Sequence, residues 1–421
     1  MDNTVLVYAD WDGLGGPQLL GYLHCLRTKA AERFDFEYAA AALETPGLQV
    51  QIDPRIWATA GRQFPAQGSD TFGVFSDASP DRWGRLLMKR RHERDKRAGA
   101  APTNARLYES DFLLGVHDSF RIGGLRFKTQ AHGPFLDDHH DRAAPPLAKL
   151  RELEEASRRF ERGEDMSEGQ DWLRMLIAPG GSLGGARPKA SVAGPENALW
   201  IAKFPSNNDD YDVGAWEMVV NTLANLCGLR VAEGTAAKFA SDHHCFMVKR
   251  FDRTQDGQRL HFASAMTMTG HADGDDHSTG VSYFEIAEVL MRHGAAPQED
   301  LKELWQRIVF NLLVSNTDDH LRNHGFILDP GRGWRLSAAY DMNPVPYADG
   351  LKLNISEDDN AMDLQLARSV AHYYRIKPSD ADAIIEHFQL RIGQFWRKAA
   401  QRAGLSRSEI EFMAPAFSLV H

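Results

Sequence analysis

The chain changes its hydrophobic pattern at Phe251, and this change limits the folds it can adopt. Before Phe251, apolar residues come in short runs separated by glycine-rich turns, as is typical of strands. After it, apolar residues recur every three to four positions, which predicts helices at 283–292, 298–315, 364–374, 379–403 and 406–413. A strand-rich part followed by a mostly helical part predicts an α+β, bilobal fold, with the cleft between the lobes as the default ligand site.

The strand-rich part itself divides in two. Short strands are expected within residues 1–45, and a densely basic helix is expected to begin near Ser79, with Ser79 as its N-cap and Pro80 at its first position. The polar stretch 134–171 predicts a connecting segment. We therefore expect a β-rich N-terminal module, a smaller lobe and a helical lobe, at residues 1–110, 111–250 and 251–421.

Composition is that of an ordinary soluble protein, with 43% hydrophobic and 25% charged residues in a chain of 421. No apolar run approaches the roughly 18 residues of a membrane span, and the N-terminus carries an acid where a signal peptide is basic. Cys25, Cys227 and Cys245 are few and widely spaced, which favours reduced thiols. We expect a cytoplasmic protein with no membrane contact, no disulfide framework and no zinc site.

The formal net charge of −10 argues against a protein that binds nucleic acid over its whole surface. The helix expected over residues 82–97 is nevertheless strongly basic. It is either a solvated helix face or a local contact for nucleic acid or an acidic partner.

Two short motifs carry residues suited to phosphoryl transfer: N-T-D-D-H-L-R-N, which contains Asp318 and Asn323, and A-Y-D-M-N-P, which contains Asp341. Such chemistry needs a carboxylate that orients or receives a hydroxyl proton, and an amide and a carboxylate that hold Mg²⁺. A catalytic aspartate stands five residues before the metal-binding asparagine in kinase loops, which favours Asp318 over Asp319. The alternative is that these residues only form a helix stop and a turn.

Upstream residues could bind the phosphates of a nucleotide. Gly180–Gly185 holds four glycines in six residues, although it lacks the spacing of the common phosphate-binding loops. Ser182 within it could itself be phosphorylated, which would displace the loop. Lys203, near the end of a predicted strand, and Glu217, early in the next predicted helix, have the placement of a phosphate-gripping lysine and the acid that holds it. Ordinary exposed residues in a linker are the alternative.

Histidines near these motifs favour structural roles over metal binding. His320 and His324 flank the catalytic candidates, and we expect them to bond the loop backbone, because no cysteine or further acid has ligand spacing to them. The run His271–His277 lacks the spacing of a calcium loop, and a solvated loop is favoured there.

With these residues in place, the chain resembles the HipA family of bacterial serine/threonine kinases, which are toxins of type II toxin–antitoxin pairs. The similarity rests on five segments: Ser182–Ala190, Trp200–Pro205, Val248–Arg253, Thr317–Asn323 and Ala339–Pro344. They match the family's glycine loop, its strand with the ATP-binding lysine, the hinge between its lobes, its catalytic loop and its metal-binding loop. Asp319 departs from the small residue that the family often has at this place.

The resemblance implies an ATP- and Mg²⁺-dependent kinase with Asp318 catalytic, Asn323 and Asp341 on the metal, and Ser182 autophosphorylated. The residues expected around the nucleotide are Gly181, Ser182, Gly184, Gly185, Lys203, Glu217, Lys249, Arg250 and Phe251. It also implies a HipB-like DNA-binding antitoxin, contact with operator DNA mostly through that antitoxin or through the basic helix 82–97, and a protein substrate such as an aminoacyl-tRNA synthetase. Two other functions stay open: a non-catalytic co-repressor, and a small-molecule or lipid kinase of the same bilobal plan.

Overall fold

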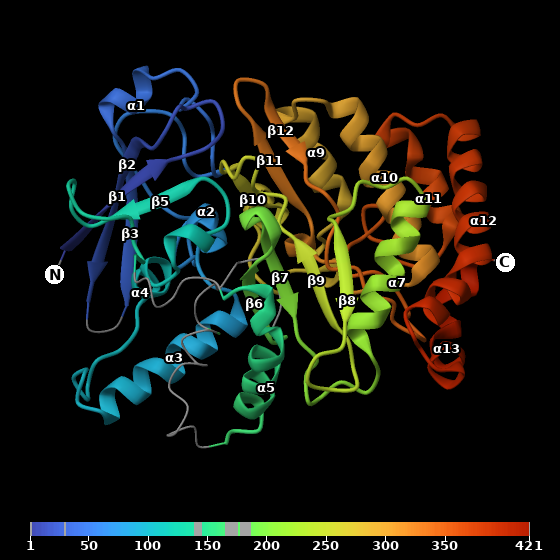
Figure 1. Ribbon diagram of the computed structural model, residues 1–421. Coiled ribbons are helices and arrows are strands. Elements are labelled where there is room, and N and C mark those ends of the chain that lie inside the picture. Colours follow the sequence, from blue (N-terminus) through green and yellow to red (C-terminus); the bar gives the residue numbers. More distant parts are fainter. Residues whose placement is uncertain (1, 29–30, 139–144, 165–175, 177–186, 421) are drawn as a thin grey trace. The chain divides into compact units, whose positions relative to one another are not determined.

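The computed structural model of the chain describes residues 2–28, 31–138, 145–164, 176 and 187–420 (Figure 1). The chain groups into two compact units. The first holds residues 1–207 and 252–270, and the second holds residues 208–251 and 271–421. Each unit is described below by itself, and the three-part division into 1–110, 111–250 and 251–421 stays a prediction.

The first unit contains an antiparallel sheet whose strand order, within the described residues, is β4-β3-β2-β1-β5. Its strands are β1 Asp2–Ala9, β2 Gln18–Arg27, β3 Glu32–Tyr38, β4 Arg62–Gln63 and β5 Leu125–Lys128. Alternate residues on β1 to β3, such as Val7, Leu23 and Phe36, are buried, as expected for a sheet with one face on the core. The predicted strands at the start of the chain are thus confirmed.

Five short or medium helices accompany this sheet, and the basic one differs from the prediction at its start. They are α1 Ala40–Glu44, α2 Gly73–Asp77, α3 Arg82–Arg97, α4 Glu109–Leu114 and α5 Leu150–Glu161. The N-cap of α3 is Asp81, whose carboxylate accepts a hydrogen bond from the Gly84 backbone N–H at 2.8 Å. The prediction of Ser79 as the N-cap of this helix is wrong, because the Ser79 hydroxyl donates to the Phe75 carbonyl of α2.

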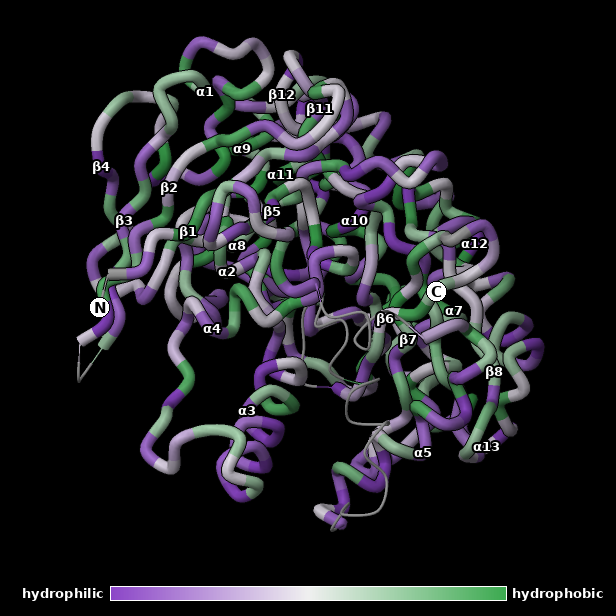
Figure 2. Tube along the Cα trace, turned by 60° about the vertical axis from the view of Figure 1, so that its left-hand side comes forward, coloured by the Kyte–Doolittle hydropathy of each residue, from purple (hydrophilic) through white to green (hydrophobic). Residues whose placement is uncertain are grey.

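The basic helix α3 is polar along most of its length (Figure 2). Trp83 and Leu87 form its buried side, and the Trp83 indole donates to the Lys189 carbonyl. Arg85 makes two hydrogen bonds, of 2.8 and 2.7 Å, to the Glu109 carboxylate. Other cations on α3, including Lys89 and Arg97, are exposed.

The first unit also holds the strand pair β6 Lys189–Ala193 and β7 Leu199–Lys203, joined in antiparallel register. Its remaining elements are β10 Phe262–Ser264 and α8 Ala265–Thr269. Asp77 at the end of α2 accepts hydrogen bonds from the backbone and hydroxyl of Ser264, which is the N-cap of α8. This contact joins residues 187 positions apart in the sequence within one unit.

The second unit is mostly helical, as predicted for the part of the chain after Phe251. Its described α-helices are α7 Val213–Leu226, α9 Tyr283–His293, α10 Pro297–Val314, α11 Leu364–Val370, α12 Pro378–Arg402 and α13 Arg407–Met413. It also holds the antiparallel pairs β8 Gly234–Ala237 with β9 Cys245–Lys249, and β11 Gly325–Asp329 with β12 Gly333–Leu336.

Helix α10 forms the centre of this unit. Its side chains are buried on nearly all sides, including Trp305, Phe310 and Leu312. Burial of each such side chain contributes about 1.5–3 kcal/mol, so α10 is held mainly by packing rather than by helix propensity. The polar residue Asn311 lies inside this apolar surrounding, close to the point where α10 ends. No helix within the described residues is long and apolar enough to cross a membrane.

Candidate active site

The predicted catalytic segment leaves α10 through a sharp turn. Ser315 ends the helix in the left-handed conformation, at φ 49°, and its hydroxyl donates to the Ala416 carbonyl. The next residue, Asn316, is buried and joins two segments: its Nδ2 donates to Asn311 Oδ1 at 3.0 Å, and its Oδ1 accepts from the Asn343 backbone N–H at 2.9 Å. Asn316 therefore fixes the segment around Asp341 against the end of α10.

Asp319 points inward and anchors the segment. Its carboxylate accepts hydrogen bonds from the Tyr283 hydroxyl at 2.6 Å and from Asn311 Nδ2 at 2.8 Å, and it lies 2.7 Å from His324 Nε2. Burial alone would raise the pKa of Asp319, but the charge of His324 and the hydrogen bonds from His324 and Tyr283 outweigh it and lower the pKa. Asp319 is thus a buried, ionised carboxylate whose Oδ2 has three partners.

Asp318 points outward and is exposed. The pKa of its carboxyl is raised, first because surrounding protein reduces its hydration, and also because the negative charge of Asp341 lies nearby. The positive charges of His320 and Lys352 act in the opposite direction. Because Asp318 and Asp341 influence one another electrostatically, the structure brings together the two acids that the sequence motifs carry 23 positions apart.

Asn323 presents an acceptor with no partner. It ends the short 3₁₀ helix Leu321–Asn323, and its Nδ2 donates to the Asp318 backbone carbonyl at 3.1 Å. Its Oδ1 is buried and, within the described part of the chain, makes no hydrogen bond. A buried carbonyl oxygen without a donor costs about 1–3 kcal/mol, and a bound cation would satisfy it.

Asp341 is the second residue that the sequence predicts at the metal. Its backbone has a φ of 57°, a left-handed conformation that aspartate tolerates better than most residues. Neighbouring residues hold it there: Tyr340 donates its hydroxyl to the Arg322 carbonyl at 2.8 Å, and the Ala339 backbone bonds to Arg230 and Ala232. One amide oxygen and carboxylates suit Mg²⁺, which binds few protein ligands and keeps several waters.

The residues expected at the hinge lie in the second unit. Lys249 ends β9, and its Nζ lies 3.5 Å from the Glu233 carboxylate. Arg250 is buried. The Phe251 ring lies 5.4 Å from the ring of Tyr340, the residue before Asp341. Phe251 is thereby placed close to the candidate metal-binding segment.

The residues predicted to bind the nucleotide phosphates do not all lie in one unit. Lys203 is buried and is the last residue of β7 in the first unit, whereas Glu217 is buried on α7 in the second. Both lie on the kinds of element predicted for them, and their pairing stays a prediction. Gly181, Ser182, Gly184 and Gly185 lie outside the described residues.

His324 and His271 make structural contacts, whereas the expected bond from the His320 ring to the loop backbone is absent among the described residues, where His320 Nδ1 is buried without a partner. His324 bonds the Asp319 carboxylate rather than the loop backbone. His271 lies 2.6 Å from Glu285 and 3.3 Å from Asp275, which fixes the 271–277 loop locally. Among the described residues, no group of three or more His, Cys, Asp or Glu side chains could hold a metal ion.

Sequence reasoning missed Tyr283 and Asn311, the two uncharged partners of Asp319. A signal for Asn311 exists, since it is a polar residue within the apolar run V-F-N-L-L-V of α10. No comparable signal marks Tyr283, which stands 36 positions before Asp319.

Comparison with solved structures defines the fold. The HipA protein of Shewanella oneidensis MR-1, solved in a complex of HipA, HipB and operator DNA, matches with a TM-score of 0.67 and 16% sequence identity. The match covers 99% of this chain and 95% of that one. The predicted class, an α+β, bilobal fold of the protein-kinase-like type, is confirmed.

Sequence comparison then gives the family. The model of the HipA-like C-terminal domain matches residues 181–396, just over half of the chain, and the chain belongs to this family. A protein of Haemophilus influenzae, provisionally named a kinase, is 30% identical over 28% of this chain and 38% of its own length. A second, provisionally named kinase Y4dM of Sinorhizobium fredii, is 29% identical over 41% of this chain and 42% of its own length. The chain thus spans about two fifths of the length of these relatives.

Proposed function

We propose that this chain is a protein kinase that transfers the γ-phosphoryl group of ATP to serine or threonine hydroxyls. The observation that carries the proposal is the buried Asn323 Oδ1, which has no hydrogen-bond partner among the described residues, while Asn323 Nδ2 donates to the Asp318 carbonyl. The negative charge of Asp341 also acts on Asp318. A turn that served only to end a helix would not need a buried acceptor left without a donor.

In the proposed reaction, the substrate hydroxyl oxygen attacks the γ-phosphorus, the bond to the β–γ bridging oxygen breaks, and ADP leaves. Asp318 orients the hydroxyl and receives its proton, which suits an exposed carboxylate whose pKa is raised toward the working range. Asn323 and Asp341 would hold Mg²⁺, which, when bound, neutralises charge on the phosphate oxygens. The buried network around Asp319 keeps Asp318 and Asn323 in place.

The nucleotide phosphates are proposed to lie against Gly181, Ser182, Gly184, Gly185 and Lys203, with Glu217 holding Lys203 and the hinge segment Lys249–Phe251 beside the nucleotide. We also propose that Ser182 is autophosphorylated, which would add charge of about −1.5 to −2 within the glycine loop and silence the enzyme.

The biological role proposed is that of a growth-arresting toxin acting on a translation component, such as an aminoacyl-tRNA synthetase. A HipB-like antitoxin would neutralise it, and operator DNA would be contacted mainly through that antitoxin. The Shewanella oneidensis HipA complex supports this partner class for the family fold. Exposed cations of α3, such as Lys89 and Arg97, are available for a direct DNA contact.

The decisive experiment compares the full chain with its Asp318→Ala variant in the presence of ATP labelled at the γ-phosphate and Mg²⁺. We expect phosphate incorporation to fall by about 10²–10⁴-fold, the usual contribution of a positioned acid or base. Asp358→Ala, an exposed aspartate of the same unit, is the matched control and should keep full incorporation. Unchanged incorporation in Asp318→Ala would overturn the assignment.

Two readouts separate this proposal from the alternatives. Mass spectrometry should find phosphate on Ser182 in the active chain and none in Asp318→Ala, as a protein kinase requires. Asp341→Ala should lose growth arrest while antitoxin-dependent operator binding persists. Growth arrest that survives in Asp341→Ala would instead favour a non-catalytic role.

A further inference from the structure

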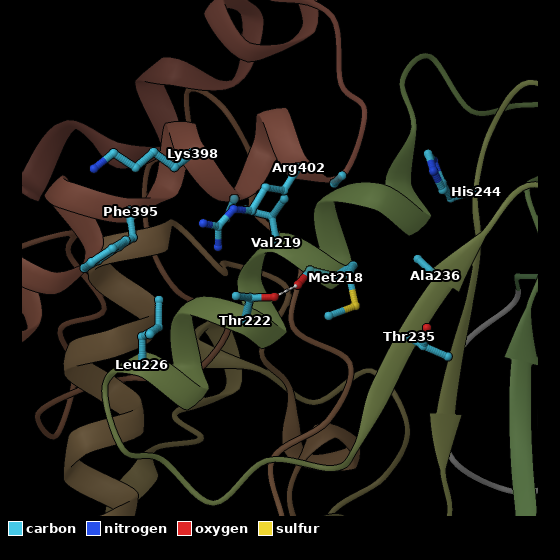
Figure 3. Close-up of a pocket in the computed structure, with 12 residues that line it drawn as sticks. Met218, Val219, Thr222, Leu226, Thr235, Ala236, His244, Phe395, Lys398 and Arg402 are labelled. Atoms are coloured by element: carbon cyan, nitrogen blue, oxygen red, sulfur yellow. Dashed lines mark hydrogen bonds between the residues drawn. The ribbon is translucent and has the colours of Figure 1, made fainter.

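A hollow of about 340 Å³ lies on the second unit, between helices α7 and α12 and the β8–β9 strand pair (Figure 3). Its lining residues come from these elements: Met218, Val219, Thr222, Leu226, Thr235, Ala236, His244, Phe395, Lys398, Ala399, Arg402 and Ala403. None of them belongs to the candidate active site. The hollow is therefore a separate feature of the unit that the proposed reaction does not use.

A second hollow, of about 450 Å³, adjoins the first along α7. Both are lined by Met218, Thr222 and Leu226, which stand four residues apart and so form one stripe of the helix. At about 1.5 Å per residue, this stripe is roughly 12 Å long. The two hollows thus form one groove, long enough for about three to four residues of an extended peptide at about 3.3 Å each.

Apolar side chains such as Met218, Val219 and Phe395 line much of the 340 Å³ hollow, and two of its polar side chains, Thr222 and His244, are already hydrogen-bonded. The Thr222 hydroxyl donates to the Met218 carbonyl at 2.9 Å (Figure 3). His244, on the strand side, lies 2.6 Å from the Asp212 carboxylate. Leu226 is 39% exposed, an unusual position for a leucine beside a hollow. An apolar side chain entering here would displace water without leaving a buried donor or acceptor unpaired.

Two cations on one side of α12 border this groove. Lys398 and Arg402 are exposed, stand one helical turn apart, and have no carboxylate within ion-pair distance in the described part of the chain. Arg397, on another side of the same helix, is instead paired with Glu411 at 2.8 Å. Lys398 has only an aromatic contact, 5.4 Å above the Phe395 ring. The one acid among the described residues that line the groove, Glu233, belongs to the second hollow and lies 3.5 Å from Lys249. The positive charge of Lys398 and Arg402 is thus left for a ligand.

We propose that this groove binds an extended peptide segment of a partner protein that carries an aliphatic or aromatic residue next to a carboxylate. The apolar residue would occupy the 340 Å³ hollow, and the carboxylate would pair with Lys398 and Arg402. A peptide fits better than a small amphipathic molecule, because the groove is open along exposed Leu226 and Thr235, whereas small ligands usually have most of their surface enclosed.

The groove lies against α7, the helix that carries Glu217, and Met218 at its centre is the next residue in the chain. A bound peptide would therefore contact the helix that holds one of the proposed nucleotide-site residues. The binding proposal itself does not depend on kinase activity, so its test uses binding alone.

The test uses a hexapeptide library on a solid support, with glycine at both ends and the four inner positions varied over Asp, Asn, Lys, Leu, Phe and Gly. The fluorescently labelled full chain should be retained by peptides with Asp beside Leu or Phe. This retention should be at least about tenfold higher than for the same peptides with Asn in place of Asp, because the Asn peptides lack the charge that pairs with the two cations. Equal retention of Asp, Asn and Lys peptides would overturn the proposal.

Matched variants locate the binding. The double variant Lys398→Glu with Arg402→Glu should lose this preference, while Arg397→Glu, on the paired side of α12, should keep it. Thr235→Arg, which places a long side chain over the hollow from exposed β8, should also abolish retention. Retention that survives both the double variant and Thr235→Arg contradicts the site. Sedimentation of the unliganded chain completes the test. If the chain is a dimer and only the double variant is a monomer, a second copy of the chain fills the groove, and the proposal of a partner peptide is overturned.

Discussion

The segment after α10 has two faces that use the same residue type in opposite ways. On the inward face, Asp319 is buried and its carboxylate is engaged by Tyr283, Asn311 and His324. On the outward face, Asp318 is exposed, and Asn323 Oδ1 has no partner among the described residues. The Asp319 carboxylate is thus held by contacts within the fold, whereas Asn323 Oδ1 is left open to a ligand in the proposed reaction.

The pKa values of the two adjacent acids follow this difference. Burial opposes ionisation of both, but partners at Asp319 overcome it and lower the pKa, while the charge of Asp341 adds to it at Asp318 and raises the pKa. These two neighbours in sequence thus differ in their surroundings, and the proposed function gives a reactive role only to Asp318. Their variants should separate stability from activity.

The largest expected effect on stability is that of Asp319→Asn. The neutral amide loses the negative charge that attracts the three partners, and its NH₂ group, a donor, cannot accept a hydrogen bond from any of them. The free energy of unfolding should therefore fall by about 3 kcal/mol. The measurement is chemical unfolding at pH 7, with Asp358→Asn as an exposed control. A loss no larger than that of the control would show that the inward network is not needed.

The pH dependence of this effect has a definite sign. Because the folded pKa of Asp319 is below its ordinary value, its contribution is fully present above the ordinary pKa of an aspartate. It is lost as the pH falls through the lowered folded pKa. The stability difference between wild type and Asp319→Asn should therefore shrink in acid.

Asp318→Asn should change the stability in the opposite direction from Asp319→Asn, and by a smaller amount. The folded pKa of Asp318 is raised, so its charged form is disfavoured by folding, and removal of the charge at pH 7 should leave stability unchanged or raise it. The gain should stay under about 1 kcal/mol, since the group is exposed and solvent screens it. Chemical unfolding of wild type and variant measures this, and a clear loss of stability would contradict an outward, functional role.

Much of this arrangement was predictable because it rests on local rules. Helical periodicity gave α9, α10, α12 and α13 close to their observed bounds. The five-residue spacing separated Asp318 from Asp319, which agrees with one acid pointing out and the other in. The catalytic role of Asp318 stays a prediction, and the structure adds that Asp318 is exposed and Asp319 buried.

The rest depends on contacts that no local rule encodes. Tyr283 reaches Asp319 only because α9 packs on α10, and the role of Asn316 needs a second segment, at Asn343. The cap of α3 was misplaced because Ser79, Pro80 and Asp81 offer a helix start in more than one register. Tertiary context decided between them: Ser79 bonds to Phe75 of α2, which leaves Asp81 to cap α3.

The most delicate test concerns the coupling of the two outward acids. Asp341→Asn removes a negative charge that raises the pKa of Asp318, so that pKa should fall. Tyr340 and Asn316 still hold the segment, since their hydrogen bonds do not involve the Asp341 side chain. Carboxyl-carbon NMR titration of the chain in the absence of nucleotide and Mg²⁺ reports the Asp318 pKa directly, with Asp358→Asn as the control. An unchanged pKa of Asp318 would mean that the charge of Asp341 does not raise it, and that Asp341 lies too far from Asp318 for both to act in one site.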